Sequence, residues 1–276
     1  NPEDYTNRGS IITPLKDRIS SQILTHYPPE ARIAADITRQ EAWTDRDTPE
    51  VVIPDDIRLL IEEISLAARE SDLVDQSSGV SARVAISAME LLVSNLERRA
   101  LATGDSPVYP RLCDLQMLLP AITGKVEMVY EGEQQGAEVV ARRLLGQALK
   151  KVFDARFPEI TKESAAGAED TGPYTPIVRW FAEGNTITVS DEQPFAGFEE
   201  ELYKVPGLKA LAARFAKGRE AQALAAEMVL EGLHQHLKLA RADLDSRVSY
   251  KEMVKFQLLK PNRGPGRGGR DRGDVN

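Results

Sequence analysis

Apolar residues recur at helical spacing through residues 54–157, and short turn signals separate the segments that carry them. In the clearest segment, neighbouring members of the stripe stand one, three or four residues apart, so all of them lie on one helical face. This stripe consists of Ile57, Leu60, Ile61, Ile64 and Ala68. Further helical segments are expected from Ser81 to Gly104, over 112–129 with a break at Pro120, and over 139–157. Four helices within about a hundred residues, joined by short loops, predict an α-helical bundle.

The segments on either side of this bundle have weaker patterns. Residues 1–45 predict short elements, including a helix over 36–43, and residues 158–259 predict a mostly helical region. In that second region the expected elements are a linker over 163–173, a helix over 177–183, an isolated strand over 186–189, and helices over 199–215, 219–244 and 250–259. The remaining residues, 260–276, combine arginine with glycine and proline, and a disordered tail is expected there.

Charge and cysteine content exclude several classes of protein. Among the 276 residues, Asp and Glu number 43 against 35 Lys and Arg, for a net charge of −8. This charge argues against specific nucleic-acid binding. The single cysteine, Cys113, can form neither an internal disulfide nor a multi-cysteine zinc site. Without an apolar run of about 20 residues, no membrane span is expected, and we expect a cytoplasmic location.

Familiar catalytic motifs are missing from the sequence. The three histidines, His26, His234 and His236, are too scattered for a histidine-based metal site, and Gly124-Lys125 lacks the rest of a phosphate-binding loop. Two arginines remain as candidates for chemistry. Arg18 follows Lys16-Asp17, and Arg83 lies in the first turn of a predicted helix. A guanidinium held there suits a triphosphate, and an ordinary exposed arginine is the alternative.

Three short motifs occur in an order that resembles AAA+ ATPases of the magnesium-chelatase subunit I and MoxR-like family. Asn1-Pro2-Glu3 resembles the sensor 1 motif, and Pro14-Leu15-Lys16-Asp17-Arg18 resembles the arginine-finger segment. Ser78-Gly79-Val80-Ser81-Ala82-Arg83 resembles the sensor 2 motif, which opens a lid helix. The resemblance covers about residues 1–157 and implies the end of an α/β ATPase core followed by a helical lid.

The resemblance also implies roles for individual residues. Asn1 would help to position the attacking water, and Arg83 would contact the nucleotide bound to its own subunit. Arg18 would reach the γ-phosphate of the neighbouring subunit, with Arg8 as the rival for this role. ATP and Mg²⁺ are the implied ligands, and a finger acting between subunits implies a homo-oligomeric ring, expected to be a hexamer. The Walker A and Walker B segments would precede Asn1, so we expect a C-terminal portion that is inactive by itself.

The expected domain organisation follows from these assignments. Residues 1–45 would end the AAA+ core, 46–157 would form the lid, 158–259 a helical C-terminal extension, and 260–276 the Arg/Gly tail. The extension favours a MoxR-like remodeller of a partner protein over a metal chelatase, and a partner with a von Willebrand A domain is implied. The predicted helix over 219–244 would either dock that partner or pack on its own bundle.

Two other functions compete with this hypothesis. The chain could be a non-catalytic helical interaction module in which the arginine motifs are accidental, or an RNA-associated protein that uses its tail. The AAA+ hypothesis makes a structural prediction of its own. Residues 1–45 would normally pack on the ATPase core, so an exposed apolar patch is expected around Ile11, Ile12 and Ile23.

Overall fold

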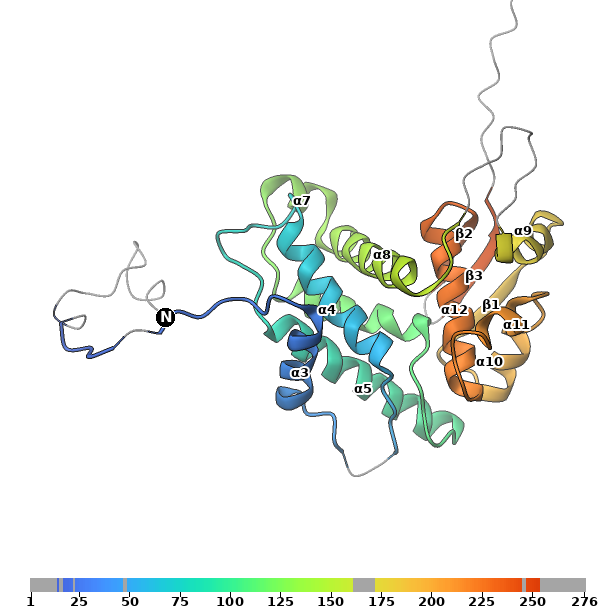
Figure 1. The fold of residues 1–276 in the computed structure, drawn as a ribbon, viewed down its shortest axis with the longest axis horizontal. Helices are drawn as coiled ribbons and strands as arrows, with labels where there is room; N and C mark the ends of the chain where they lie inside the picture. The colour runs from blue at the N-terminus through green and yellow to red at the C-terminus, as the bar shows by residue number, and fades with distance from the viewer. Residues whose placement is uncertain are drawn as a thin grey trace, which may run out of the picture.

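The computed structural model describes residues 14, 17–21, 23–46, 49–160, 172–244 and 247–253. The fold is mainly helical, with one small three-stranded sheet, as the mainly α prediction required. Figure 1 shows the helical bundle next to a C-terminal part in which helices surround the sheet. Asn1, Arg8 and the tail over 260–276 lie outside the described residues, so the predictions for them stay predictions.

Four helices dominate the first part of the chain. They are α3 (Ala31–Glu41), α4 (Asp55–Glu70), α5 (Arg83–Thr103) and α8 (Ala137–Arg156). Helix α4 packs against α3, α5 and α8. Asp55 and Asp56 stand in its first turn and Arg69 in its last, which suits the helix dipole. Helix α5 ends as predicted at Gly104, whose φ of +77° is readily available to glycine.

The connection between α5 and α8 differs from the prediction. Instead of one helix over 112–129, the structure has a 3₁₀ helix η1 (Leu112–Leu118), a short helix α6 (Leu119–Thr123) and, after a loop, α7 (Tyr130–Gln135). Pro120 lies in the first turn of α6, where its missing N–H costs no helical hydrogen bond. The break predicted at Pro120 is therefore the start of a separate helix.

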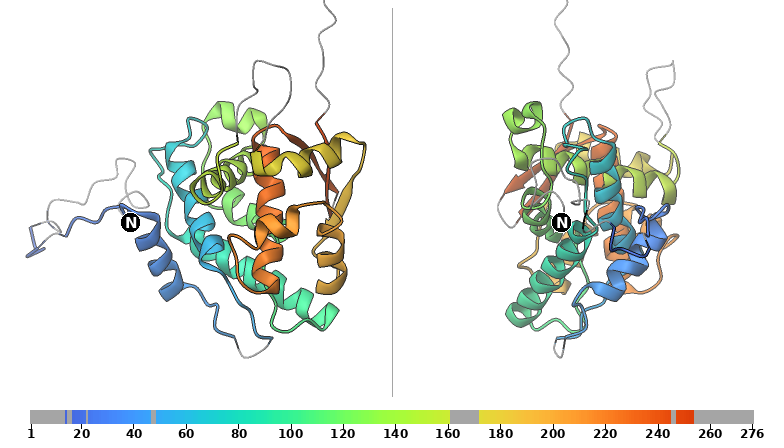
Figure 2. Two further views of the ribbon diagram at one scale, coloured as in Figure 1. Left: turned by 45° about the vertical axis from the view of Figure 1, so that its right-hand side comes forward. Right: turned by 90° about the vertical axis from the view of Figure 1, so that its left-hand side faces the viewer.

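The C-terminal part mixes helices with strands. Its helices are the short η2 (Gly172–Tyr174), α9 (Thr175–Ala182), α10 (Phe195–Leu202), α11 (Leu208–Ala212) and α12 (Arg219–Gln235). Its strands are β1 (Ile187–Ser190), β2 (Leu239–Leu244) and β3 (Arg247–Glu252), in the order β1-β3-β2. Both strand pairs are antiparallel, with Val189 and Asp243 on either side of Val248. Figure 2 shows this sheet from two further sides.

Three secondary-structure predictions for this region are wrong in part. The helix expected over 219–244 ends at Gln235, because Leu237 takes a left-handed φ of 57° and β2 follows. Residues 250–252, at the start of the helix expected over 250–259, belong to β3 instead. The helix expected over 199–215 is two helices, separated at Gly207 with its φ of +79°. The strand expected over 186–189 is confirmed, but it is paired with β3 and not isolated.

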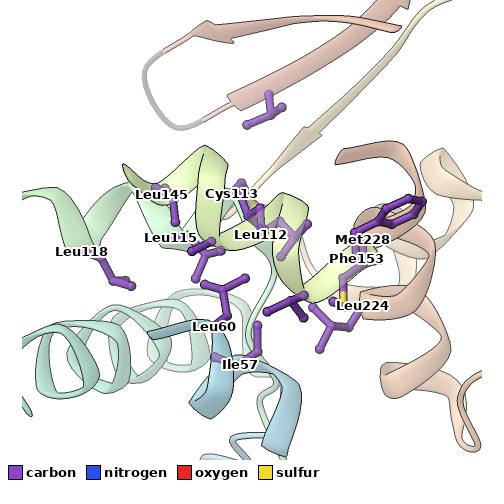
Figure 3. Close-up of a cluster of buried hydrophobic side chains, with 14 of the residues drawn as sticks. Ile57, Leu60, Leu112, Cys113, Leu115, Leu118, Leu145, Phe153, Leu224 and Met228 are labelled. Carbon is purple, nitrogen blue, oxygen red and sulfur yellow. The ribbon is translucent and has the colours of Figure 1, made fainter. Parts of the chain in front are cut away.

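One hydrophobic core runs through both parts of the chain. Buried residues from Ala42 to Tyr250 form a single cluster, and α12 packs directly against α8. Figure 3 shows Leu224 and Met228 of α12 near Phe153 of α8 and Leu112 of η1. The two helices approach each other closely at Gly232, where even a β-carbon would collide with the Phe153 ring. The hydrophobic core therefore continues past residue 157, where the sequence predicts a domain boundary.

None of the described helices is both long enough and hydrophobic enough to cross a lipid bilayer.

Candidate functional site

Arg83 is the first residue of α5, and its side chain is exposed. Its backbone N–H donates to Ser81 Oγ at 3.2 Å, although Ala82 and not Ser81 occupies the cap position. No hydrogen bond or ion pair to another described residue occupies the Arg83 guanidinium. The fork of five donors is therefore free to bind an anion, while its stem starts from a long, buried helix.

The loop before α5 is held by its own polar side chains. Asp75 Oδ1 accepts hydrogen bonds from the Ser77 N–H at 2.8 Å and from the Ser77 hydroxyl at 2.7 Å. These bonds favour the carboxylate, so they lower the pKa of Asp75 below its ordinary value. Ser78 Oγ donates to Glu127, which belongs to the segment between α6 and α7. The start of the loop is thus fixed at two points.

A second set of contacts fixes the end of this loop, and we call it the Tyr27 latch. It consists of Tyr27, Arg69, Gly79 and Val80. The Val80 N–H donates to the Tyr27 hydroxyl oxygen at 3.0 Å, and Arg69 donates to the Val80 carbonyl from Nε at 3.3 Å and Nη2 at 3.1 Å. The Arg69 guanidinium also stacks over the Tyr27 ring at 3.9 Å. Both backbone polar groups of Val80 are therefore satisfied by side chains.

The remaining predicted site residues are Arg18, Arg8 and Asn1. Arg18 is exposed in a turn, and within the described ranges it makes no hydrogen bond or ion pair. No contact between described residues joins Arg18 to Arg83, and the role predicted for Arg18 stays a prediction. Asn1 and Arg8 lie outside the residues that the structure describes, so their predicted roles are not tested.

The segment that leads into the bundle exposes many apolar side chains. Ile23 is 86% exposed and Leu24 72%. The exposure predicted for Ile23 is therefore confirmed, whereas Ile11 and Ile12 fall outside the described residues, so the patch as a whole stays a prediction. Residues 23–28 form neither helix nor strand, and Figure 1 shows the deep-blue stretch before α3 running away from the bundle.

A buried network of charged side chains lies between the bundle and the C-terminal part, and the sequence pattern does not predict it. Arg99 Nη1 contacts both Asp114 oxygens at 2.6 Å, and the Arg111 N–H donates to Asp114 at 2.7 Å. The Leu112 N–H donates to Glu227 of α12 at 2.8 Å. Burial raises the pKa of Glu227 to about 8, and it also raises the pKa of Cys113. Arg99, Asp114 and Glu227 are almost inaccessible, so their role is to join parts of the fold.

The functional and buried residues that the sequence did not predict have only weak signals in the sequence itself. Asp114 interrupts an otherwise apolar run around Leu115, which marks it as a buried carboxylate in need of a partner. Tyr27 and Arg69 carry no comparable signal, because the hydrogen bond from Val80 to Tyr27 spans 53 residues. Among the described residues, no group of three or more His, Cys, Asp or Glu side chains could hold a metal ion.

Comparison with known proteins does not identify the family of this chain. No family model matches the chain, and neither the curated proteins nor the solved structures contain a match to it. The resemblance to AAA+ ATPases therefore stays a prediction that rests on the three short sequence motifs.

Proposed function

We propose that this chain is the lid-containing portion of an oligomeric MoxR- and magnesium-chelatase-like AAA+ ATPase that remodels a partner protein. The observation that carries the proposal is the position of Arg83. It is an exposed guanidinium without a described partner, at the first residue of a helix that packs in the core, behind a loop that Tyr27 and Arg69 hold in place. Phosphoryl transfer depends mainly on positioning and on stabilising charge, and a guanidinium attached to this fixed helix start would contribute to both.

The exposed apolar segment before α3 supports the same proposal. Side chains such as Ile23 and Leu24 are costly to leave in water, and contiguous exposed apolar surface is typical of an interface. We expect the nucleotide-binding core of the ATPase to cover them. Because Arg83 opens α5 and Tyr27 follows this segment directly, the nucleotide would lie between the core and the loop before α5.

The described residues fit one of the two implied ligands. Arg83 offers donors to a phosphate of ATP, but the described carboxylates include no group that could hold Mg²⁺. The proposal therefore assigns Mg²⁺ no ligand among these residues. It keeps Arg18 as the finger that acts on a neighbouring subunit, with Arg8 as its rival, and a ring, expected to be a hexamer, as the active assembly.

The test uses the complete ATPase polypeptide, including a Walker A segment that these 276 residues do not contain. The ATPase rate is measured against protein concentration for the wild type, Arg83→Ala and Arg18→Ala. Arg143→Ala is the matched control, because Arg143 is exposed on α8 and makes no hydrogen bond or ion pair within the described residues.

A rate that rises cooperatively with concentration, falls in Arg83→Ala and Arg18→Ala, and stays unchanged in Arg143→Ala is the expected result. Loss of a finger arginine costs about 10³ to 10⁵ in rate in related systems. Activity that survives Arg18→Ala would transfer the finger role to Arg8. Absence of ATPase activity at every concentration would overturn the proposal in favour of a non-catalytic interaction module.

A further inference from the structure

We propose that Tyr27 is a positioning residue that sets the location of Arg83 through the Tyr27 latch. This inference rests on the proposed function, since it concerns how the lid arginine is held relative to the nucleotide. Tyr27 touches neither Arg83 nor, in the proposal, the nucleotide. It acts on the loop backbone three residues before Arg83.

Val80 is the point at which the latch holds the loop. Its side chain is fully buried, its N–H donates to Tyr27 and its carbonyl accepts from Arg69. Val80 is therefore fixed on three sides. Since α5 begins three residues later, the position of Val80 sets where the first turn of α5, and with it the Arg83 side chain, emerges from the fold.

Gly79 leaves the room that the close approach of Tyr27 requires. Its φ is +72°, and a β-carbon at this position would lie 2.6 Å from the Tyr27 hydroxyl oxygen. Any other residue here would be strained and would push the Tyr27 ring away. The glycine of the sensor 2-like motif thus makes room for a tyrosine from a distant segment.

Tyr27 is also the link between that distant segment and the bundle. Within described residues 17–21 and 23–28, Tyr27 is the side chain that makes a hydrogen bond or ring contact with the bundle. Its ring is half exposed, with one face on Arg69. A contact of this kind can open and close as the segment moves, because little buried surface is lost when it opens. Closing it would bring Arg83 into its working position.

The first measurement tests the latch in this chain, independently of any ATPase activity. Amide hydrogen exchange at Val80 is compared between the wild type and Tyr27→Phe, which removes the hydroxyl and keeps the ring over Arg69. Tyr109→Phe is the control, because the Tyr109 hydroxyl makes no hydrogen bond with the described residues. Faster exchange at Val80 in Tyr27→Phe alone is expected, and unchanged exchange would overturn the latch.

The second measurement tests the effect of the latch on Arg83 in the complete ATPase. Tyr27→Phe is expected to lower kcat/KM for ATP about threefold to tenfold, the effect of one lost hydrogen bond. In an Arg83→Ala background the same change should have no further effect, since Tyr27 acts through Arg83. Equal melting temperatures for wild type and Tyr27→Phe would show that the loss of rate is not a loss of fold.

The outcomes separate this inference from the proposed function. If Arg83→Ala leaves the ATPase rate unchanged, the proposed function fails for Arg83 whatever Tyr27 does. If Arg83→Ala lowers the rate but Tyr27→Phe does not, the positioning role is overturned and the proposed function stands. If Tyr27→Phe lowers the rate by the same factor in both backgrounds, Tyr27 acts independently of Arg83 and the inference is again overturned.

Discussion

Replacing Gly232 with alanine tests how closely α12 is packed on α8. At an open helical position this change stabilises a protein by up to about 1 kcal/mol, because alanine is the better helix former. At Gly232 the added β-carbon would collide with the ring of Phe153. That ring is buried and packs against Phe157 at 5.2 Å and Tyr174 at 6.0 Å between ring centroids, so it has little room to move. Overpacking of this kind costs about 1–3 kcal/mol. After the gain from the better helix former is subtracted, we expect a net destabilisation of about 1 kcal/mol.

Two other glycines provide matched controls for this experiment. Gly197 in α10 has no atom within 4 Å of an added β-carbon, so alanine there should be neutral or stabilising. A β-carbon added at Gly146 in α8 would lie 3.1 to 3.4 Å from the side-chain amide of Gln235. The stability of Gly146→Ala should therefore fall between those of the other two variants. Urea unfolding followed by circular dichroism gives the order of the midpoints. A Gly232→Ala midpoint as high as that of Gly197→Ala would refute the proposed packing of α12 on α8.

Further predictions concern the buried ionic network and the exposed segment. Burial raises the pKa of Glu227 from 4.5 to about 8, so folded wild type retains a proton that the unfolded chain releases. Its free energy of unfolding should therefore fall as the pH rises from about 4.5 to about 8, and Glu227→Gln should show a flatter profile in urea titrations at pH 5, 7 and 9. Asp114→Asn removes the charge partner of buried Arg99 and should destabilise the protein by about 3–5 kcal/mol in the same assay at pH 7. Ile23→Lys should leave the free energy of unfolding within about 0.5 kcal/mol of wild type, because Ile23 is 86% exposed.

The bundle helices were predictable because their signals are local. The stripe that begins at Ile57 faces the core as its spacing indicates, and Gly104 ends α5 as expected. The strands after α12 were missed, although β2 and β3 are neighbours in the chain and pair as a hairpin. Only β3 also has a distant partner, since Tyr250 pairs with Ile187 in β1. Strand pairing can override local helix propensity, and the apolar spacing of one segment does not record its strand partner.

The residues of the candidate site differ in the same way, since local signals predict some of them and not others. Arg83 could be found because a motif and a helix start coincide at one place in the chain. Tyr27 and Arg69 could not, because their contacts with Val80 depend on how separate segments meet in three dimensions. The pairing of Arg99 with Asp114 was hidden for a similar reason, since an arginine on a helix ordinarily suggests an exposed position.

The single core described above has a mechanical consequence. Interiors packed this densely compress very little, so a displacement at one end is passed on to the other. The contact between α8 and α12 and the hydrogen bond from Leu112 to Glu227 tie the sheet of the C-terminal part to the bundle. A rotation of the bundle would therefore carry α12 with it, and with α12 the strand β2 that it contacts.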